Sequence, residues 1–329
     1  MEKASYWDRM DDGRIECVLC PRHCRLKDGQ VGFCRVRKNI DGELYALTYG
    51  KVSAIHDDPI EKKPLYHFYP GSDILSIGGI GCSLSCDFCQ NRSLVDGRVP
   101  LIDLPPEKLL KAVNEYASIG VAYTYNEPLI QFEYVLDCAK LLKQNGKVNV
   151  LVTNGYLEPT PFDELIYYID ALNIDLKFSD NRMYERLCKG TKEPVIRNIK
   201  AAYEAGAHVE VTNLIVTRAN DTREAIQEIV DIVASIGKDI PLHFSRYFPH
   251  YKYDEPPTDP DILLEAWRIA KKKLLYVYIG NLPTEMYSNT YCPLCNSLLI
   301  ARSGYFTKVV GMDGSRCRNC GYVIRGRFR

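Results

Sequence analysis

The order of apolar and polar positions predicts a chain of alternating strands and helices. From residue 73 onward, short apolar runs of strand length recur, and stretches with helical periodicity separate them. The predicted strands cover residues 73–80, 121–126, 148–153, 171–177, 208–216 and 240–247. The predicted helices cover residues 105–118, 128–145, 161–169, 194–205, 222–236 and 259–273, and an apolar strand follows at 274–280. This rhythm is typical of a parallel sheet with crossover helices, so we expect an α/β fold with a partial (β/α)6 barrel.

The same pattern divides the chain into three predicted parts. Residues 1–72 form a loop-rich N-terminal segment with four cysteines, residues 73–282 form the barrel, and residues 283–329 form a small C-terminal module. Because the carboxyl ends of parallel strands carry the working loops in such barrels, we expect the functional residues at that edge.

Composition and charge exclude several classes of protein. Among 329 residues, 42 basic and 42 acidic side chains give a net charge of zero, so no overall field favours nucleic acid, and we expect no nucleic-acid partner. No apolar run approaches the ~18 residues of a membrane helix, and the acidic start of the chain lacks a signal-peptide core. We therefore expect a cytoplasmic protein with no membrane contact.

Cysteine is the unusual component, because 11 of the 13 cysteines fall into three clusters. In a reducing compartment such clusters favour metal binding over disulfides, and thiolate-rich sites favour an anaerobic setting. The central cluster, Cys82, Cys86 and Cys89, has the spacing C-x3-C-x2-C directly after the first predicted barrel strand. Three thiolates are one ligand short of a closed site, so this triad predicts a metal centre with an open position.

The two outer clusters each contain four cysteines, enough to close a site. Cys17, Cys20, Cys24 and Cys34 lie in a short loop-rich segment that a metal would stabilise, and either zinc or a four-iron cluster fits them. Cys292, Cys295, Cys317 and Cys320 form two C-x2-C pairs with 21 residues between them. That arrangement is typical of a zinc ribbon, with rubredoxin-like iron as the alternative.

The triad and its position carry a family resemblance. The segment from Gly81 to Asn91, with Phe88 before the last cysteine, resembles the radical S-adenosylmethionine (radical SAM) superfamily, in the form found in activating enzymes of glycyl-radical enzymes. The whole chain resembles most closely the radical SAM enzymes of the AmmeMemoRadiSam system. This resemblance implies that the triad holds three irons of a 4Fe-4S cluster and that S-adenosylmethionine binds the fourth. It also implies a flavodoxin- or ferredoxin-like electron donor and a 5'-deoxyadenosyl radical that abstracts a substrate hydrogen.

The resemblance further implies which residues contact S-adenosylmethionine. Glu127 matches the acid of the Gly-Gly-Glu segment that receives the methionine amino group in this superfamily, although the preceding residues here are Tyr125 and Asn126. Asp175 and Lys177 match an Asp-x-Lys of the activating enzymes, and their alternation places both on one side of a strand. The remaining cofactor-binding candidates are Phe88 (on the adenine), Tyr125, Asn126, Thr153, Asn154, Asn213 and His243. His243 and Arg246 are also the candidates for a catalytic role.

Two mechanisms fit such an enzyme. It would either activate a partner protein by forming a radical on it, or modify a peptide or small-molecule substrate with the N-terminal site as an auxiliary cluster. The alternative from another class is a non-enzymatic multi-zinc adaptor or nucleic-acid-binding protein, which leaves the three-cysteine set unexplained. The two remaining cysteines, Cys138 and Cys188, are predicted to pack in the core.

Overall fold

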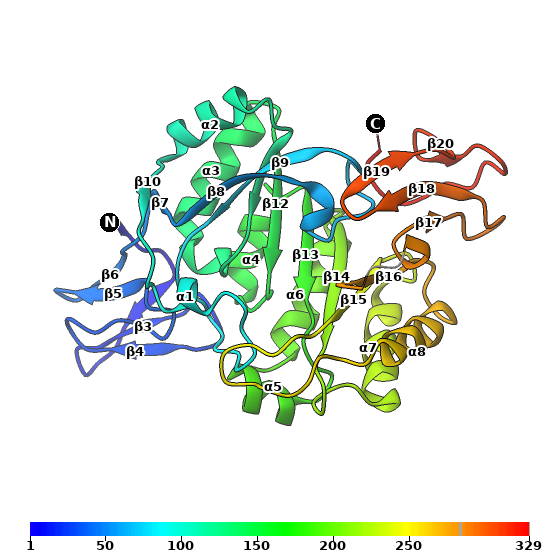
Figure 1. The fold of residues 1–329 in the computed structure, drawn as a ribbon. Coiled ribbons are helices and arrows are strands. Elements are labelled where there is room, and N and C mark those ends of the chain that lie inside the picture. Colours follow the sequence, from blue (N-terminus) through cyan, green and yellow to red (C-terminus); the bar gives the residue numbers. More distant parts are fainter. Residues whose placement is uncertain (283–284, 329) are drawn as a thin grey trace.

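An eight-stranded sheet forms the centre of the computed structural model, which describes residues 1–282 and 285–328 (Figure 1). The strand order is β16-β15-β14-β13-β12-β11-β9-β8, and β8 is antiparallel to β9 while all the others are parallel. The bounds are β8 (Ala54–Pro59), β9 (Asp73–Gly78), β11 (Gly120–Tyr123), β12 (Val148–Thr153), β13 (Ala171–Asp175), β14 (His208–Ile215), β15 (Leu242–Arg246) and β16 (Val277–Gly280). Since β8 and β16 are the edges of this sheet, the barrel is partial, as predicted.

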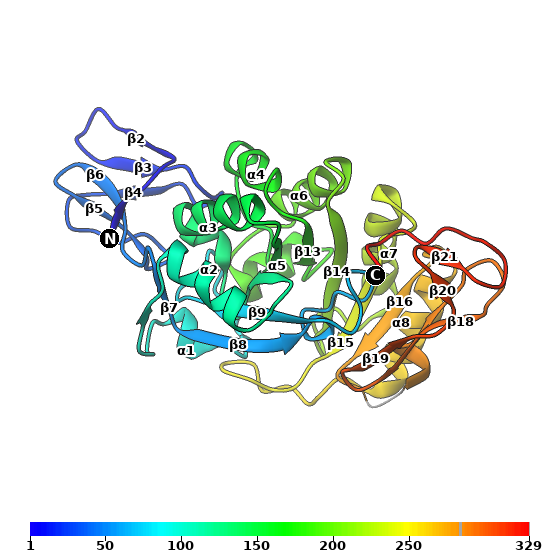
Figure 2. The ribbon, with the colours of Figure 1, turned by 90° about the horizontal axis from the view of Figure 1, so that it is seen from above.

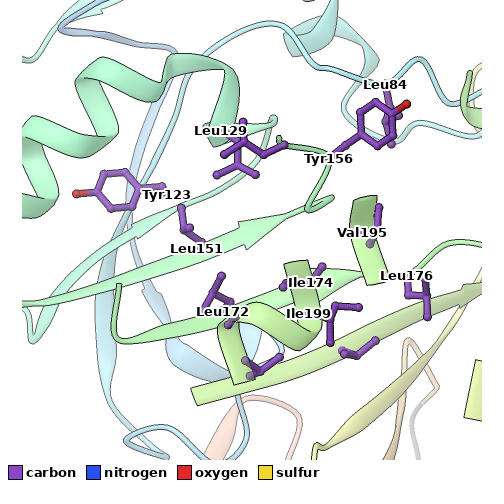
Figure 3. Packing of buried hydrophobic residues seen from close by; sticks show 14 of the residues in the cluster. Leu84, Tyr123, Leu129, Leu151, Tyr156, Leu172, Ile174, Leu176, Val195 and Ile199 are labelled. Atoms are coloured by element: carbon purple, nitrogen blue, oxygen red, sulfur yellow. The ribbon is translucent and has the colours of Figure 1, made fainter. Parts of the chain in front are cut away.

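Helices connect the parallel strands and cover the outer face of the sheet (Figures 1 and 2). They are α1 (Arg92–Val95), α2 (Pro106–Glu115), α3 (Phe132–Gln144), α4 (Pro159–Ile166), α5 (Asn181–Cys188), α6 (Glu193–Glu204), α7 (Arg223–Ile236) and α8 (Pro260–Lys271), with the short 3-10 helices η1 (Ile60–Lys62) and η2 (Pro128–Gln131). Figure 3 shows the core between these layers, where Leu151 and Leu172 of neighbouring strands face the α6 residue Ile199. No helix of the described residues is both long and apolar enough to cross a membrane.

The N-terminal segment lies at one end of the sheet and consists of short antiparallel pairs (Figure 2). Its strands are β1 (Glu2–Lys3), β2 (Trp7–Arg9), β3 (Ile15–Cys17), β4 (Cys24–Leu26), β5 (Arg37–Ile40), β6 (Glu43–Ala46) and β7 (Lys51–Val52), the last paired with β10 (Ile102–Asp103). Arg37 is buried and donates two hydrogen bonds of 2.9 Å to Glu133 on α3. This paired, desolvated contact fixes the segment against the barrel.

The C-terminal module lies at the opposite end and packs on the last barrel strand (Figures 1 and 2). It contains η3 (Glu285–Tyr287), β17 (Thr290–Tyr291), β18 (Leu298–Ser303), β19 (Phe306–Val309), β20 (Met312–Asp313) and β21 (Arg316–Cys317). Leu299 and Ile300 share a buried cluster with Tyr276 and Tyr278. The predicted start of the module, residue 283, lies outside the described residues.

The sheet contains one strand, β8, that the sequence pattern placed in the N-terminal segment. Residues 44–56 alternate loosely and resemble a connector, yet β8 pairs along its whole length with β9, from Ala54 opposite Gly78 to Pro59 opposite Asp73. Helix α5 was not predicted either. It is short, and its exposed face carries charged side chains that interrupt a clear apolar pattern.

Candidate active site

The three cysteines of the triad line one cavity at the carboxyl ends of the parallel strands. Cys82, Cys86 and Cys89 lie on the loop between β9 and α1, and the cavity they share has a volume of about 470 Å³. This size is within the range of about 300–1,000 Å³ that is usual for small-molecule sites. The triad therefore faces a space large enough for a ligand of cofactor size.

The end of helix α5 supports the triad loop. The backbone N–H groups of Ser85 and Asp87 donate to the carbonyl oxygens of Cys188 and Leu187, at 3.0 and 2.8 Å. Cys188 is fully buried, as its predicted core position requires, and its thiol also reaches the triad. The hydrogen bond from Cys188 lowers the pKa of Cys86 below its ordinary value, with the Lys177 ammonium acting in the same direction.

Glu127 is the buried carboxylate of the cavity. It follows β11 and is the N-cap of η2, where its Oε1 accepts a 3.0 Å hydrogen bond from the Leu129 N–H. Thr153 Oγ1 donates to the same oxygen at 2.6 Å, and the Asn154 N–H donates to Oε2 at 2.8 Å. Burial raises the pKa of Glu127 to about 7 despite these three hydrogen bonds. A carboxylate in this state gains from a cationic partner, because the cation offsets the cost of burying the charge.

Tyr125 and Asn126 also line the cavity, but their side chains are engaged with the protein. Asn126 Oδ1 accepts from the Gly79 N–H at 2.7 Å, and its Nδ2 donates to the carbonyl oxygens of Ile80 and Gly81 at 3.0 and 3.2 Å. Its amide group therefore braces the backbone that leads into the triad. The Tyr125 hydroxyl donates to Asp58 on β8.

Replacing Asn126 with alanine should loosen this backbone. We expect a loss of about 1–3 kcal/mol in the free energy of unfolding, since buried donors and acceptors of the loop lose their partners. Thermal or urea unfolding measures this loss, with Asn114→Ala on α2, where the side chain is exposed, as the control. An unchanged stability in Asn126→Ala would contradict the bracing role.

The other polar candidates reach the cavity from neighbouring strand ends. Asp175 and Lys177 both line it and form a 3.0 Å ion pair. Burial opposes the charge on Lys177, but the Asp175 carboxylate and nearby cysteines hold its pKa well above the ordinary value. Phe88 lines the cavity as well and packs edge-on against Phe178. Thr153 and Asn154 complete the predicted residues that the structure brings together.

Three predicted residues are not brought to the cavity, and each has a partner elsewhere. Asn213 donates to the carbonyl oxygens of Leu176 and Lys177, at 2.7 and 3.1 Å. These two hydrogen bonds hold the end of the Asp175–Lys177 segment in place. Arg246 donates from Nε to the Thr258 carbonyl oxygen at 2.8 Å and stacks over Phe248.

His243 lies deeper in the barrel than the cavity. Its Nε2 is 2.6 Å from Glu210 Oε2, and Glu210 also pairs with His208 at 2.8 Å. Burial opposes the charge, yet the two histidines hold the pKa of Glu210 well below its ordinary range. The structure thus gives His243 a buried ionic partner rather than a place beside the triad, because it occupies an early position of β15, two residues before the cavity-lining Ser245.

Several cavity residues were not predicted from the sequence. Thr212 and Leu214 on β14 line the cavity, whereas the predicted Asn213 lies between them and points to the other side of the sheet. Lys62 and Lys63 also line it, and both pair with Asp58, at 2.8 and 2.6 Å. Strand alternation is the sequence signal that identifies Thr212. The two lysines can be assigned to the cavity only when β8 is known to belong to the sheet.

The donor set fits an iron-sulfur cluster on the triad. Zinc bound by four thiolates brings the sulfurs within ~3.8 Å of one another, given Zn–S bonds of about 2.3 Å. Within residues 1–282 and 285–328, one group of potential metal ligands has all its ligand atoms within 4.8 Å of one another. It consists of Cys292, Cys295, Cys317 and Cys320. Two of these sulfur pairs are 3.5 and 3.7 Å apart. The C-terminal module therefore has the geometry of a single-metal site, and the more open triad does not.

Comparison with known proteins agrees with this geometry. Residues 76–233 match the family described as the radical SAM superfamily. An uncharacterized protein of Methanocaldococcus jannaschii is 42% identical over 332 residues, which covers 98% of this chain and 99% of that protein. The chain belongs to the radical SAM superfamily. The long alignment extends past the barrel into both cysteine-rich ends.

Other relatives place the chain near the activating enzymes within the radical SAM superfamily. A pyruvate formate-lyase-activating enzyme of Clostridium pasteurianum is 27% identical over 217 residues, covering 61% of this chain and 88% of that enzyme. Among solved structures, a radical SAM methyltransferase from Sphaerobacter thermophilus has a TM-score of 0.50 at 13% identity, covering 64% of this chain and 67% of that one. This last likeness shows a shared fold.

Proposed function

We propose that this protein reductively cleaves S-adenosylmethionine and uses the released 5'-deoxyadenosyl group to remove a hydrogen atom from a substrate. The observation that carries this proposal is the shared cavity of an incomplete three-cysteine set and the buried Glu127 carboxylate. When bound, a 4Fe-4S cluster held by Cys82, Cys86 and Cys89 supplies the electron for the cleavage.

The residues of the chain would bind and orient S-adenosylmethionine. Glu127 would accept the methionine amino group, because a buried carboxylate that already holds three donors is fixed in place for a cation. Lys177 would face the carboxylate group, with Asp175 holding its ammonium in position. Phe88 would pack on the adenine, since its ring offers a flat apolar surface in the cavity.

A partner protein is the substrate we favour, and a flavodoxin- or ferredoxin-like protein is the expected electron donor. The support is that relatives carry the names of pyruvate formate-lyase-activating and glycyl-radical enzyme activating enzymes. The second candidate is the modification of a peptide or small molecule, and the additional four-cysteine site beside the triad favours it. We place this reaction in the reducing, oxygen-poor cytoplasm that thiolate-bound iron requires.

The C-terminal four-cysteine site has a separate role in this proposal. We expect zinc there, because four close thiolates form a tetrahedral structural site, and iron in the same geometry is the alternative. The metal would stabilise a module that has few buried residues of its own.

Deuterium transfer distinguishes the two substrate classes. The reconstituted enzyme is incubated with dithionite, S-adenosylmethionine and size-fractionated extract of cells grown in deuterated medium, and 5'-deoxyadenosine is analysed by mass spectrometry. We expect 5'-deoxyadenosine to contain deuterium when the enzyme is incubated with the protein fraction. Deuterium from the small-molecule fraction would support the second candidate, and cleavage with no deuterium from any fraction would contradict hydrogen abstraction from a cellular substrate.

A further inference from the structure

The four N-terminal cysteines surround a small internal cavity next to the triad loop. Cys17, Cys20, Cys24 and Cys34 all line it, and so does Ser83, the residue that follows the first triad cysteine. Three of the four are buried, and Cys24 is half-buried. None of the four forms a disulfide, so their sulfurs are available as ligands.

The spacing of these sulfurs differs from that of a zinc site. The C-terminal four lie together within 4.8 Å, and in the described part of the chain no three of the N-terminal sulfurs come as close to one another. A single zinc would draw its thiolates to ~3.8 Å. Sulfurs held farther apart around a cavity instead suit a polynuclear iron-sulfur core, which occupies the space between its cysteines.

A buried donor without a partner lies at the same cavity. Arg37 lines it and is 1% exposed. Its two terminal nitrogens bind Glu133, but its Nε has no hydrogen-bond partner among the described residues. An unpaired buried N–H is costly, and an anionic cluster with sulfide and thiolate acceptors would satisfy it. The N–H of Phe33 already donates to Cys24 Sγ at 3.5 Å.

The N-terminal site is in direct packing contact with the triad loop. Gly81 precedes Cys82 with a φ of +83°, and a Cβ at this position would lie 2.2 Å from the Cys34 carbonyl oxygen. Arg22, two residues after Cys20, donates from Nε to the Ser83 carbonyl oxygen at 2.8 Å and also binds the Lys189 carbonyl oxygen. The two sites therefore meet at two points, once between the backbones of Gly81 and Cys34 and once through the Arg22 side chain.

We infer that Cys17, Cys20, Cys24 and Cys34 bind a polynuclear iron-sulfur cluster, an auxiliary centre that passes single electrons to the cluster on the triad. A reduced flavodoxin- or ferredoxin-like donor loses one electron to the auxiliary cluster, which then returns to its oxidised state as the triad cluster gains that electron. No proton or bond changes in this step. The relay rests on the proposed function, whereas the occupancy of the site does not.

Metal analysis of a protein without the triad tests the occupancy. The triple variant Cys82→Ala, Cys86→Ala, Cys89→Ala leaves the N-terminal site untouched. After anaerobic reconstitution with iron and sulfide, we expect it to retain about four irons per chain, with sulfide and an iron-sulfur absorption band. A variant that holds zinc at this site, or no metal there, would overturn the inference. The added variant Cys20→Ala in the triple background should lose the iron and keep the C-terminal metal.

Reduction kinetics test the relay separately. The variant Cys20→Ala, Cys34→Ala keeps the triad, and its triad cluster should be reduced by a flavodoxin or ferredoxin at least about tenfold more slowly than in the unmodified protein. An equal rate would overturn the relay. Arg37→Lys, which keeps a charge but removes the Nε donor, should shift the midpoint potential of the auxiliary cluster and leave that of the triad cluster unchanged. Because iron in the triple variant is read without S-adenosylmethionine, these outcomes do not depend on whether cleavage occurs.

Discussion

Replacing Cys86 with alanine should abolish the release of 5'-deoxyadenosine from S-adenosylmethionine. Cys86 is one of three sulfurs facing the cavity, and no other cysteine of the described chain lines it besides Cys82 and Cys89. With only two thiolates left, the triad can no longer hold its cluster in the open arrangement that leaves one iron for the cofactor. Product formation is measured by chromatography under anaerobic conditions with dithionite.

The control for this prediction is a cysteine that lies away from the site. Cys138 is fully buried in α3, so Cys138→Ala removes a sulfur of the same type from the core and should cost stability while keeping cleavage and iron. Both variants should also retain the C-terminal metal. Cleavage that survives in Cys86→Ala would show that the triad assignment is wrong.

The second large effect is expected at Glu127. The variant Glu127→Gln removes the charge that would pair with the methionine amino group, and hydrogen bonds to charged groups contribute about 1.5–3 kcal/mol. We therefore expect the affinity for S-adenosylmethionine to fall roughly tenfold to 150-fold. Equilibrium binding to the reconstituted protein measures this change. Glu204→Gln, which alters an exposed carboxylate on α6, is the matched control.

The pH dependence separates loss of this contact from simple damage to the site. Burial raises the pKa of Glu127 to about 7, so below that pH the free carboxyl is largely neutral and must lose its proton to pair with a cation. The affinity of the unmodified protein should accordingly rise between about pH 6 and pH 7, and this rise should be absent in Glu127→Gln. A variant with the same pH profile as the parent would contradict the role assigned to Glu127.

The fold and the triad could be predicted from the sequence because both depend on local patterns. Apolar runs at strand and helix spacing identified the parallel strands from β9 to β16, and the cysteine spacing identified the three cysteines that share one cavity. The family resemblance implied Glu127, Thr153, Asp175 and Lys177, and all four line the cavity at the carboxyl ends of the parallel strands.

Two predicted residues, Asn213 and His243, do not line the cavity, and the side of the strand or the depth along it is the reason. Asn213 has the chemistry of a binding residue, but the alternation of β14 turns its neighbours Thr212 and Leu214 toward the cavity. His243 lies on β15 before the part of the strand that reaches the cavity, and its side chain contacts Glu210 on the adjacent strand β14. Neither contact can be read from one strand alone, since each depends on register between strands.

Contacts between distant segments were also beyond the sequence. Lys62 and Lys63 reach the cavity because β8, which carries their partner Asp58, pairs antiparallel to β9, a pairing that loose alternation does not specify. The closeness of the N-terminal cysteines to the triad likewise depends on the packing of Gly81 against Cys34. These contacts form the surroundings of the triad.

The most direct test of the central claim is cleavage of S-adenosylmethionine by the anaerobically reconstituted, unmodified protein. With dithionite as the reductant, we expect 5'-deoxyadenosine and methionine to appear in equal amounts and only when the protein carries iron and sulfide. A protein that holds only zinc, or that carries a complete cluster on the triad and yet forms neither product, would contradict the account.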